Sequence, residues 1–282
     1  MKALVYTGKE SLEIQDCPKP EPRDGEVLIR VDSVGICGSD MHAYLGHDER
    51  RPAPLILGHE AAGVVVGGAS DGRRVTVNPL VTCGTCRACQ AGQDNLCPDR
   101  QIISMPPREG AFAQWLIMPE GNLVSVPDDI SFERAALAEP IACGWHAVRL
   151  GRKALGLADM TAAGAKLRSD EPKQRALVMG GGAIGLGAAL SCQAQGIADV
   201  TLVEPNDLRR SFLQETCGQK AVTPDAVSAE GGYDLVIDGV GYAATRAQAS
   251  ALVRPGGVIM HIGLGSAEGG LDIRRMTLQE IT

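Results

Sequence analysis

Aromatic residues are scarce in this chain of 282 residues, because Phe, Trp and Tyr together make up only 3% of it. Basic residues are also too few for a nucleic-acid binder, since 27 Lys and Arg stand against 34 Asp and Glu and leave a net charge of -7. A phosphate backbone needs a positively charged partner surface, so this balance argues against DNA or RNA. Apolar runs are all far shorter than the roughly eighteen residues of a membrane-spanning helix, which argues against a membrane protein.

The N-terminus lacks the long apolar centre of a signal peptide. In MKALVYTGKESLEI a short apolar run gives way to charged residues. We therefore expect a cytoplasmic protein, in a compartment where thiols stay reduced. Four scattered cysteines are then expected to be free thiols: Cys17, Cys143, Cys192 and Cys217.

Four of the nine cysteines lie in one short stretch, CGTCRACQAGQDNLC, as Cys83, Cys86, Cys89 and Cys97. Thiolates at these spacings can close around a single zinc ion. Two disulfide bonds are the alternative, but so short a stretch would strain both bridges, and nothing indicates export. We expect a structural zinc site here.

Short β-rich segments separated by Gly, Pro and Asp turns fill the first 125 or so residues. From Ser131, which can cap a helix, the sequence turns helical and stays so through Ala147. The polar stretch 159–174 is expected to be a surface excursion. After Arg175, apolar strands alternate with helices, which predicts an α/β domain with a doubly wound parallel sheet.

A glycine-rich turn follows the predicted strand 176–179 and opens a predicted helix. Its residues are Gly180, Gly181, Gly182, Ala183, Ile184 and Gly185, which satisfy the GxGxxG pattern. Backbone N–H groups at such a turn can bind a pyrophosphate, and Glu204, nineteen residues further on, is placed to bind the adenosine ribose. A carboxylate there repels a 2′-phosphate and favours NAD over NADP, although Arg209 and Arg210 could partly reverse that preference.

A second group of residues that can bind a metal is spread over three segments, ICGSDMH, LGHEAAG and AEPIACGWH. These segments supply Cys37, His59, Glu60 and Glu139. Each residue taken singly has an ordinary explanation as a buried thiol, a turn histidine or a solvated acid. In order, however, CGSD, GHE, the four-cysteine stretch, EP and GxGxxG resemble the zinc-dependent medium-chain dehydrogenases, especially the sorbitol and polyol dehydrogenase branch. This resemblance spans almost the whole chain.

The resemblance implies a GroES-like zinc-binding catalytic domain over residues 1–149 and a Rossmann NAD-binding domain over residues 150–282. It makes Cys37 and His59 ligands of a catalytic zinc, with Glu60 completing the set in the polyol branch. Glu139 would bind the metal directly, through water, or in exchange with Glu60. Cys143, one turn after Glu139, could compete as a ligand, but the resemblance places it nearer the nicotinamide.

Further roles follow from the same resemblance. Ser39 matches the hydroxyl relay of the family, and His42 matches a downstream relay histidine of some relatives, a surface position being the alternative. Asp40 is expected to orient His59. The implied cofactor-binding set also includes Ile262 and Leu264.

The resulting prediction is an enzyme that transfers hydride from a secondary alcohol of a polyol, sugar alcohol or sugar acid to NAD, with one catalytic and one structural zinc. Alternatives are an L-threonine 3-dehydrogenase-like enzyme and a non-catalytic zinc- and dinucleotide-binding module. The chain ends at LQEIT, soon after the predicted strand VIMHIG, where relatives usually continue. We therefore expect a chain truncated at its C-terminus, and a homodimer or homotetramer if it is complete.

Overall fold

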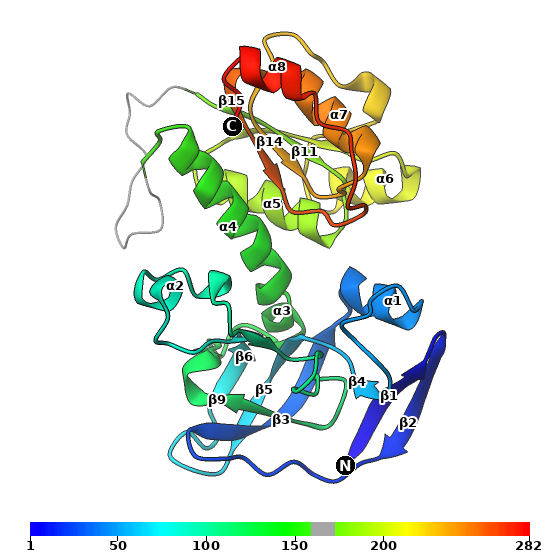
Figure 1. The fold of residues 1–282 in the computed structure, drawn as a ribbon, viewed down its shortest axis with the longest axis vertical. Helices are drawn as coiled ribbons and strands as arrows, with labels where there is room; N and C mark the ends of the chain where they lie inside the picture. The colour runs from blue at the N-terminus through cyan, green and yellow to red at the C-terminus, as the bar shows by residue number, and fades with distance from the viewer. Residues whose placement is uncertain (159–172) are drawn as a thin grey trace. The chain divides into compact units, whose positions relative to one another are not determined.

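Two five-stranded sheets organise the chain, one in each of two units, Met1–Glu139 and Pro140–Thr282. The computed structural model describes residues 1–158 and 173–282 (Figure 1). The units meet inside the helix α4 (Ala138–Ala154), and the sequence-based boundary after residue 149 lies in the same helix. The polar stretch expected at 159–174 falls, except for its last two residues, outside the described part of the chain.

The first unit is built from short antiparallel strands. They are β1 (Lys2–Gly8), β2 (Ser11–Asp16), β3 (Glu26–Gly35), β4 (Leu55–Ile56), β5 (Glu60–Val66), β6 (Arg74–Val77), β7 (Leu80–Val81), β8 (Gln101–Ile102), β9 (Trp115–Pro119) and β10 (Leu123–Ser125). The main sheet has the order β10-β6-β5-β3-β9, and β2-β1-β4 and β7-β8 form smaller sheets. Buried aliphatic side chains such as Ile29, Val65 and Met118 fill its core, as expected for strands rich in β-branched residues.

Pairing between β3 and β5 positions the first candidate site. The antiparallel register brings Gly35, the last residue of β3, opposite Glu60, the first residue of β5. Cys37 follows β3 directly and precedes the short helix α1 (Gly38–Tyr44), while His59 precedes β5. Segments more than twenty residues apart in the sequence are thereby adjacent in space.

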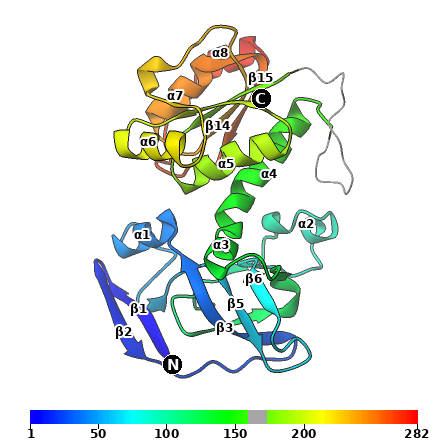
Figure 2. The same cartoon turned by 180° about the vertical axis from the view of Figure 1, so that it is seen from behind.

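The second unit contains a parallel sheet of β11 (Arg175–Met179), β12 (Asp199–Val203), β13 (Ala221–Val222), β14 (Tyr233–Asp238) and β15 (Val253–His261), in the order β13-β12-β11-β14-β15. Alternate residues of β11 face opposite cores. Ala176 and Val178 belong to one core, and Leu177 and Met179 belong to the other. Helices therefore cover both faces, α4 and α5 (Ala183–Ala194) on one, α7 (Ala243–Leu252) and α8 (Ile273–Leu278) on the other (Figures 1 and 2). The strand order reverses between β11 and β14, and open α/β sheets bind their ligands at the carboxyl ends of the strands at such a point.

The helix expected to run on from Ser131 is interrupted. Ser131 caps the short helix α3 (Phe132–Ala136), with its side chain accepting from Arg134 N–H, and α3 ends at Leu137. Pro140 explains the break, because a proline is tolerated only in the first turn of a helix, so α4 has to begin just before it. Even α4 has only 17 residues, and among the described residues no helix is both long and apolar enough to cross a membrane.

Candidate functional site

A thiol, an imidazole and a carboxylate meet at the junction of β3 and β5. Ligand atoms of Cys37, His59 and Glu60 all lie within 4.8 Å of one another, and His59 and Glu60 are buried. Gly35 makes the space for this group, because a Cβ at that position would lie 2.0 Å from Oε2 of Glu60. Three of the residues predicted to bind the catalytic zinc are therefore brought together by strand register.

Asp40 is a buried carboxylate that supports this group. Its oxygens accept hydrogen bonds from Cys37 N–H at 3.0 Å and Gly58 N–H at 3.2 Å. Oδ1 also lies 3.5 Å from Nδ1 of His59, an ion-pair distance rather than a hydrogen bond. Burial raises the pKa of Asp40, but His59 and the two N–H donors lower it overall, so Asp40 stays anionic beside the imidazole.

The charges of the site suit a divalent cation. Burial lowers the pKa of His59, but Asp40 and Cys37 raise it to about 10. Burial raises the pKa of Glu60. Burial also raises the pKa of Glu139, the charges of Glu60 and Asp40 raise it further, and the charge of His59 lowers it in part. Nδ1 of His59 is buried and has no hydrogen-bond partner among the described residues. Thiolate, imidazole and carboxylate donors in such surroundings fit zinc.

Glu139 stands apart from that group. Its half-buried carboxyl is close enough to His59 and Glu60 to feel their charges, yet the donor atoms within 4.8 Å of one another come from Cys37, His59 and Glu60 among the described residues. Of the predicted relay residues, His42 has its ring 6.4 Å from that of His47.

A buried arginine that the sequence did not reveal contacts the predicted relay hydroxyl. Arg51 is 3% exposed and donates from Nη2 to Ser39 Oγ at 3.4 Å. Its Nε donates to Ser104 O at 3.0 Å, and its Nη1 pairs with Asp48. Arg51 thus ties α1 to two loops. Nothing in the sequence separates Arg51 from its neighbour Arg50, and only the structure shows that Arg51 is buried and Arg50 exposed. A buried charge requires partners.

The four clustered cysteines form a second potential metal site. Sulfur-to-sulfur distances are 4.0 Å for Cys83 and Cys89, 3.5 Å for Cys86 and Cys89, and 3.6 Å for Cys83 and Cys97. A tetrahedral zinc with Zn–S bonds of about 2.3 Å has ligand separations of about 3.8 Å. The N–H groups of Thr85 and Cys86 lower the pKa of Cys83 to about 6, whereas burial and the neighbouring Cys86 and Cys97 thiols raise that of Cys89 to about 12. Four thiols this close cannot all ionise without a cation between them, and zinc would supply that charge. The geometry fits zinc and is too open for disulfides.

The glycine-rich turn after β11 is shaped by close backbone packing. Gly180 has φ +89°, and a Cβ on Gly185 would lie 1.7 Å from Gly180 O, so no larger residue fits there. Gly182 is the N-cap of α5 and is followed by Ala183 and Ile184 in its first turn. Nothing lies within 4 Å of a Cβ built on Gly182, so this residue faces open space at the helix N-terminus. That arrangement can bind a pyrophosphate.

Glu204 follows β12 and is 2% exposed. Oε2 accepts from Gly181 N–H at 2.9 Å and pairs with Arg209 Nη1 at 3.2 Å, while Oε1 accepts from Asn206 N–H at 2.8 Å. Burial raises the pKa of Glu204, but these donors lower it overall. An ionised carboxylate thus lies directly beside the glycine-rich turn, as the sequence predicts.

The remaining predicted cofactor residues also lie in the second unit. Ile262 is half-buried and Leu264 is 84% exposed, both just beyond the carboxyl end of β15. Cys143 lies on α4 beside Gly144, where a Cβ would be 2.5 Å from Ala188 N of α5. That close helix contact holds Cys143 near the N-terminal half of α5.

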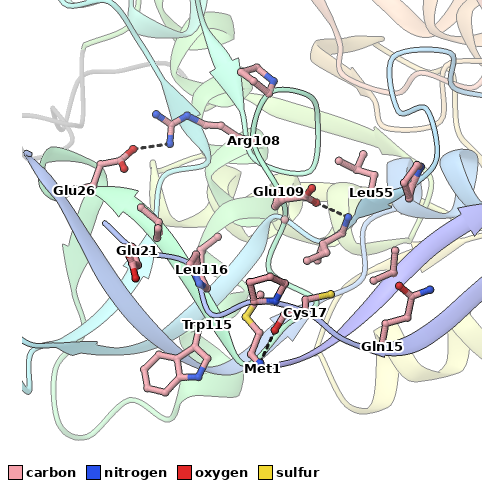
Figure 3. A pocket seen from close by; sticks show the side chains of 18 of the residues that line it. Met1, Gln15, Cys17, Glu21, Glu26, Leu55, Arg108, Glu109, Trp115 and Leu116 are labelled. Carbon is pink, nitrogen blue, oxygen red and sulfur yellow. Dashed lines mark hydrogen bonds and ion pairs between the residues drawn. The ribbon is translucent and has the colours of Figure 1, made fainter. Parts of the chain in front are cut away.

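A pocket of about 600 Å³ lies elsewhere in the first unit (Figure 3). None of the predicted site residues lines it. Three of its charged side chains already have protein partners, because Arg108 pairs with Glu26 and Glu109 accepts from Ile56 N–H. We therefore assign no chemistry to this pocket.

Comparison with known proteins decides the family. Residues 23–128 match the alcohol dehydrogenase GroES-like domain, and residues 183–282 match the zinc-binding dehydrogenase family. Sorbitol dehydrogenase of Bacillus subtilis (strain 168) is 35% identical over 284 residues, which cover 94% of this chain and 76% of that protein. The chain belongs to the zinc-dependent medium-chain alcohol and polyol dehydrogenases. This assignment confirms the predicted family and fold class.

Two further relatives of this dehydrogenase agree. L-galactonate-5-dehydrogenase of Escherichia coli (strain K12) is 34% identical over 95% of this chain and 77% of its own length. An alcohol dehydrogenase of Escherichia coli CFT073, solved with NADH, has 25% identity and a TM-score of 0.84 over 100% of this chain and 82% of its own. Zinc and a nicotinamide dinucleotide are thus the cofactors of this family.

Proposed function

We propose that this dehydrogenase oxidises a secondary hydroxyl of a polyol, sugar alcohol or sugar acid with NAD. The observation that carries the proposal is the donor group of Cys37, His59 and Glu60, in which a glutamate rather than a second cysteine lies beside the thiol and imidazole. The names of the relatives support the substrate class, since they include a sorbitol and a galactonate dehydrogenase.

In this proposal Cys37, His59 and Glu60 hold zinc, and Glu139, whose pKa responds to the charges of His59 and Glu60, is the candidate to exchange with Glu60. When bound, zinc would supply Lewis-acid stabilisation of negative charge on the substrate oxygen, and NAD the hydride acceptor. The Asp40 carboxylate, 3.5 Å from Nδ1 of His59, would stabilise the orientation of that imidazole by its charge.

Ser39 takes the proton that the alcohol loses. Arg51 donates to Ser39 Oγ and, being an arginine, cannot accept a proton in return. The Ser39 hydroxyl therefore accepts the substrate proton on its free lone pair and releases its own proton to His42, three residues further along α1, or to water, because Arg51 can take none. Arg51 sets the orientation of this hydroxyl.

NAD is the proposed dinucleotide because Glu204 keeps an ionised carboxylate beside the glycine-rich turn. Two ribose hydroxyls can donate to it, whereas a 2′-phosphate would be repelled.

The test is NADH formation by the zinc-loaded protein with sorbitol, galactitol, L-idonate, L-galactonate and L-threonine, together with zinc content by mass spectrometry. We expect two zinc ions per chain and the highest kcat/KM on a polyol or sugar acid. Preference for L-threonine would favour the threonine dehydrogenase alternative. Dinucleotide binding without turnover on any of these alcohols would contradict the proposal and favour a non-catalytic module.

We further propose a cytoplasmic enzyme that associates with copies of itself. Support comes from nine cysteines without a disulfide among the described residues, and from the exposed Ile273 and Leu278 of α8. Light scattering of the purified protein would distinguish a homodimer or homotetramer from a monomer.

A further inference from the structure

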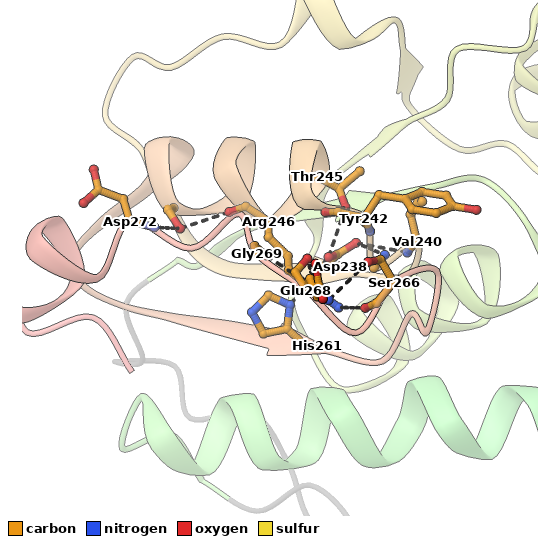
Figure 4. Close-up of polar contacts among 12 residues, drawn as sticks. Asp238, Val240, Tyr242, Thr245, Arg246, His261, Ser266, Glu268, Gly269 and Asp272 are labelled. Atoms are coloured by element: carbon orange, nitrogen blue, oxygen red, sulfur yellow. Dashed lines mark hydrogen bonds and ion pairs between the residues drawn. The ribbon is translucent and has the colours of Figure 1, made fainter.

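The side chain of Arg246 fastens the loop that follows β15 to the helix α7. Arg246 donates from Nη2 to Ser266 O at 2.5 Å, and from Nη1 to Glu268 O at 3.0 Å and Gly269 O at 3.4 Å. Figure 4 shows the guanidinium reaching from α7 into this loop. Three carbonyl oxygens of residues 266–269 are therefore satisfied by one cation.

The position of Arg246 is not one that helix chemistry favours. It is the fourth residue of α7, where the positive end of the helix dipole opposes a cation. Charge-assisted hydrogen bonds to carbonyl oxygens offset this cost. A cation at the N-terminal end of a helix is locally unfavourable, so the presence of Arg246 there indicates a role outside its own helix.

The start of the same loop is locked to the turn after β14. Gly265 N–H donates to Val240 O and Ser266 N–H donates to Gly241 O. A Cβ on Gly241 would lie 2.2 Å from Gly263 O, so the two backbones touch. Residues 263–266 can then shift only if the turn at 240–241 shifts with them.

That turn is held in its own place by Asp238, which is fully buried at the end of β14. Its oxygens accept from Val240 N–H at 3.0 Å, Gly241 N–H at 2.8 Å and the Thr245 hydroxyl at 3.1 Å (Figure 4). Burial raises the pKa of Asp238, but His261 and these donors lower it overall. An anion at Asp238 and a cation at Arg246 thus fix the two ends of the 263–269 loop.

We propose that Arg246 is a positioning residue for the nicotinamide half of the cofactor. It holds the loop so that Ile262 and the exposed Leu264 form a preordered surface at the carboxyl edge of the sheet. This inference rests on the proposed function and on the family resemblance, which implies that those two residues belong to the cofactor site. Without Arg246, only the backbone bonds of residues 262–266 would hold the loop. Binding of the nicotinamide would then have to order residues 266–269 and would lose affinity for that reason.

The test compares two ligands on the full chain. Arg246→Met removes all three donations while keeping a side chain of similar length. Isothermal titration should give a Kd for NADH about tenfold higher than in the wild type, equivalent to about 1.4 kcal/mol. The Kd for ADP-ribose should stay within about twofold, because that ligand lacks the nicotinamide and depends on the turn 180–185 and Glu204.

Arg275→Met is the matched control. Arg275 also donates to main-chain carbonyls, Ser250 O and Val253 O, but it fastens α8 rather than the 266–269 loop. It should leave both Kd values unchanged. Arg246→Lys, which keeps one cationic donor, should recover part of the NADH affinity and also serves if Arg246→Met does not fold.

Each other outcome has a distinct meaning. An unchanged NADH Kd in Arg246→Met, or an equal loss for NADH and ADP-ribose, would overturn the positioning role while leaving the proposed function intact. A wild-type protein that binds no NADH would overturn the proposed function and this inference with it.

Discussion

At the scale of single residues, two buried glutamates have been given opposite properties by their neighbours. Glu204 accepts from two backbone N–H groups and an arginine, and its pKa is lowered overall. Glu60 is buried with fewer compensating donors, and its pKa is raised. Hydrogen-bond donors keep Glu204 ionised, so it can accept hydrogen bonds from the neutral hydroxyls of a ribose. Glu60 has fewer donors, and its ionised form requires a nearby cation to be stable. The same side chain therefore suits a nucleotide site in one place and a metal site in the other.

Glu204→Gln should shift the coenzyme preference toward NADP. The substitution removes the repulsive charge and releases Arg209, whose Nη1 lies 3.2 Å from the carboxylate, to bind a 2′-phosphate. A hydrogen bond to a charged group contributes roughly 1.5–3 kcal/mol, so we expect the ratio of kcat/KM for NADP to that for NAD to rise roughly tenfold or more. Steady-state kinetics with both coenzymes measures the ratio.

The double variant Glu204→Gln with Arg209→Met is the control for that shift. It should lose most of the gained NADP activity, because the released guanidinium is then absent. If the double variant kept the full gain, Arg209 would not be the phosphate partner.

Glu60→Gln should weaken zinc binding at the catalytic site more than Glu139→Gln. An oxygen of Glu60 lies within 4.8 Å of the Cys37 and His59 ligand atoms, whereas Glu139 is coupled to them through charge alone in the described structure. Zinc loss at rising chelator concentration, followed by mass spectrometry, should show a roughly tenfold difference between the two variants. Earlier zinc loss from Glu139→Gln would make Glu139 the third ligand instead.

At the scale of elements, the turn between β11 and α5 contains two glycines that are required for different reasons. A Cβ on Gly185 would lie 1.7 Å from Gly180 O, whereas a Cβ on Gly182 meets nothing within 4 Å. One glycine is required by the fold itself. The other leaves open the space in which a pyrophosphate would lie.

Gly185→Ala should therefore destabilise the second unit by about 3 kcal/mol, as overpacking does. Gly182→Ala should leave the thermal unfolding temperature nearly unchanged and still raise the Kd for NADH several-fold, because its Cβ projects toward the phosphate position. Thermal unfolding and titration of both variants give the comparison. Equal unfolding temperatures for the two variants would contradict it.

Local spacing accounts for the elements and motifs that the sequence could predict. The four cysteines and the glycine-rich turn each lie within one short segment, and Glu204 lies one strand and helix from that turn, a distance fixed by βαβ geometry. Arg51, Gly35 and Arg246 could not be predicted in this way. Their roles depend on strand register and loop packing between distant segments, which no short sequence window contains.

At the scale of the whole molecule, the two kinds of site belong to different units. All eight predicted zinc ligands lie in Met1–Glu139, and the glycine-rich turn and Glu204 lie in Pro140–Thr282. Each unit also has its own buried aliphatic cores. Metal loading and nucleotide binding should then be separable by mutation, because the predicted zinc ligands and the predicted pyrophosphate and ribose residues belong to different units.

Cys97→Ser should lower the zinc content from two ions per chain to one and leave the Kd for ADP-ribose unchanged. Cys97 is the fully buried member of the four-cysteine group, so its loss opens that site. The residues predicted to bind ADP-ribose, the glycine-rich turn and Glu204, lie in the second unit. Cys217→Ser, at a half-buried thiol outside both metal-ligand groups, should change neither quantity. Mass spectrometry and titration give the two readouts on the same preparation. A weaker ADP-ribose affinity in Cys97→Ser would mean that the nucleotide site depends on the folding of the zinc-binding unit, and the two units would then have to be treated as one cooperative structure.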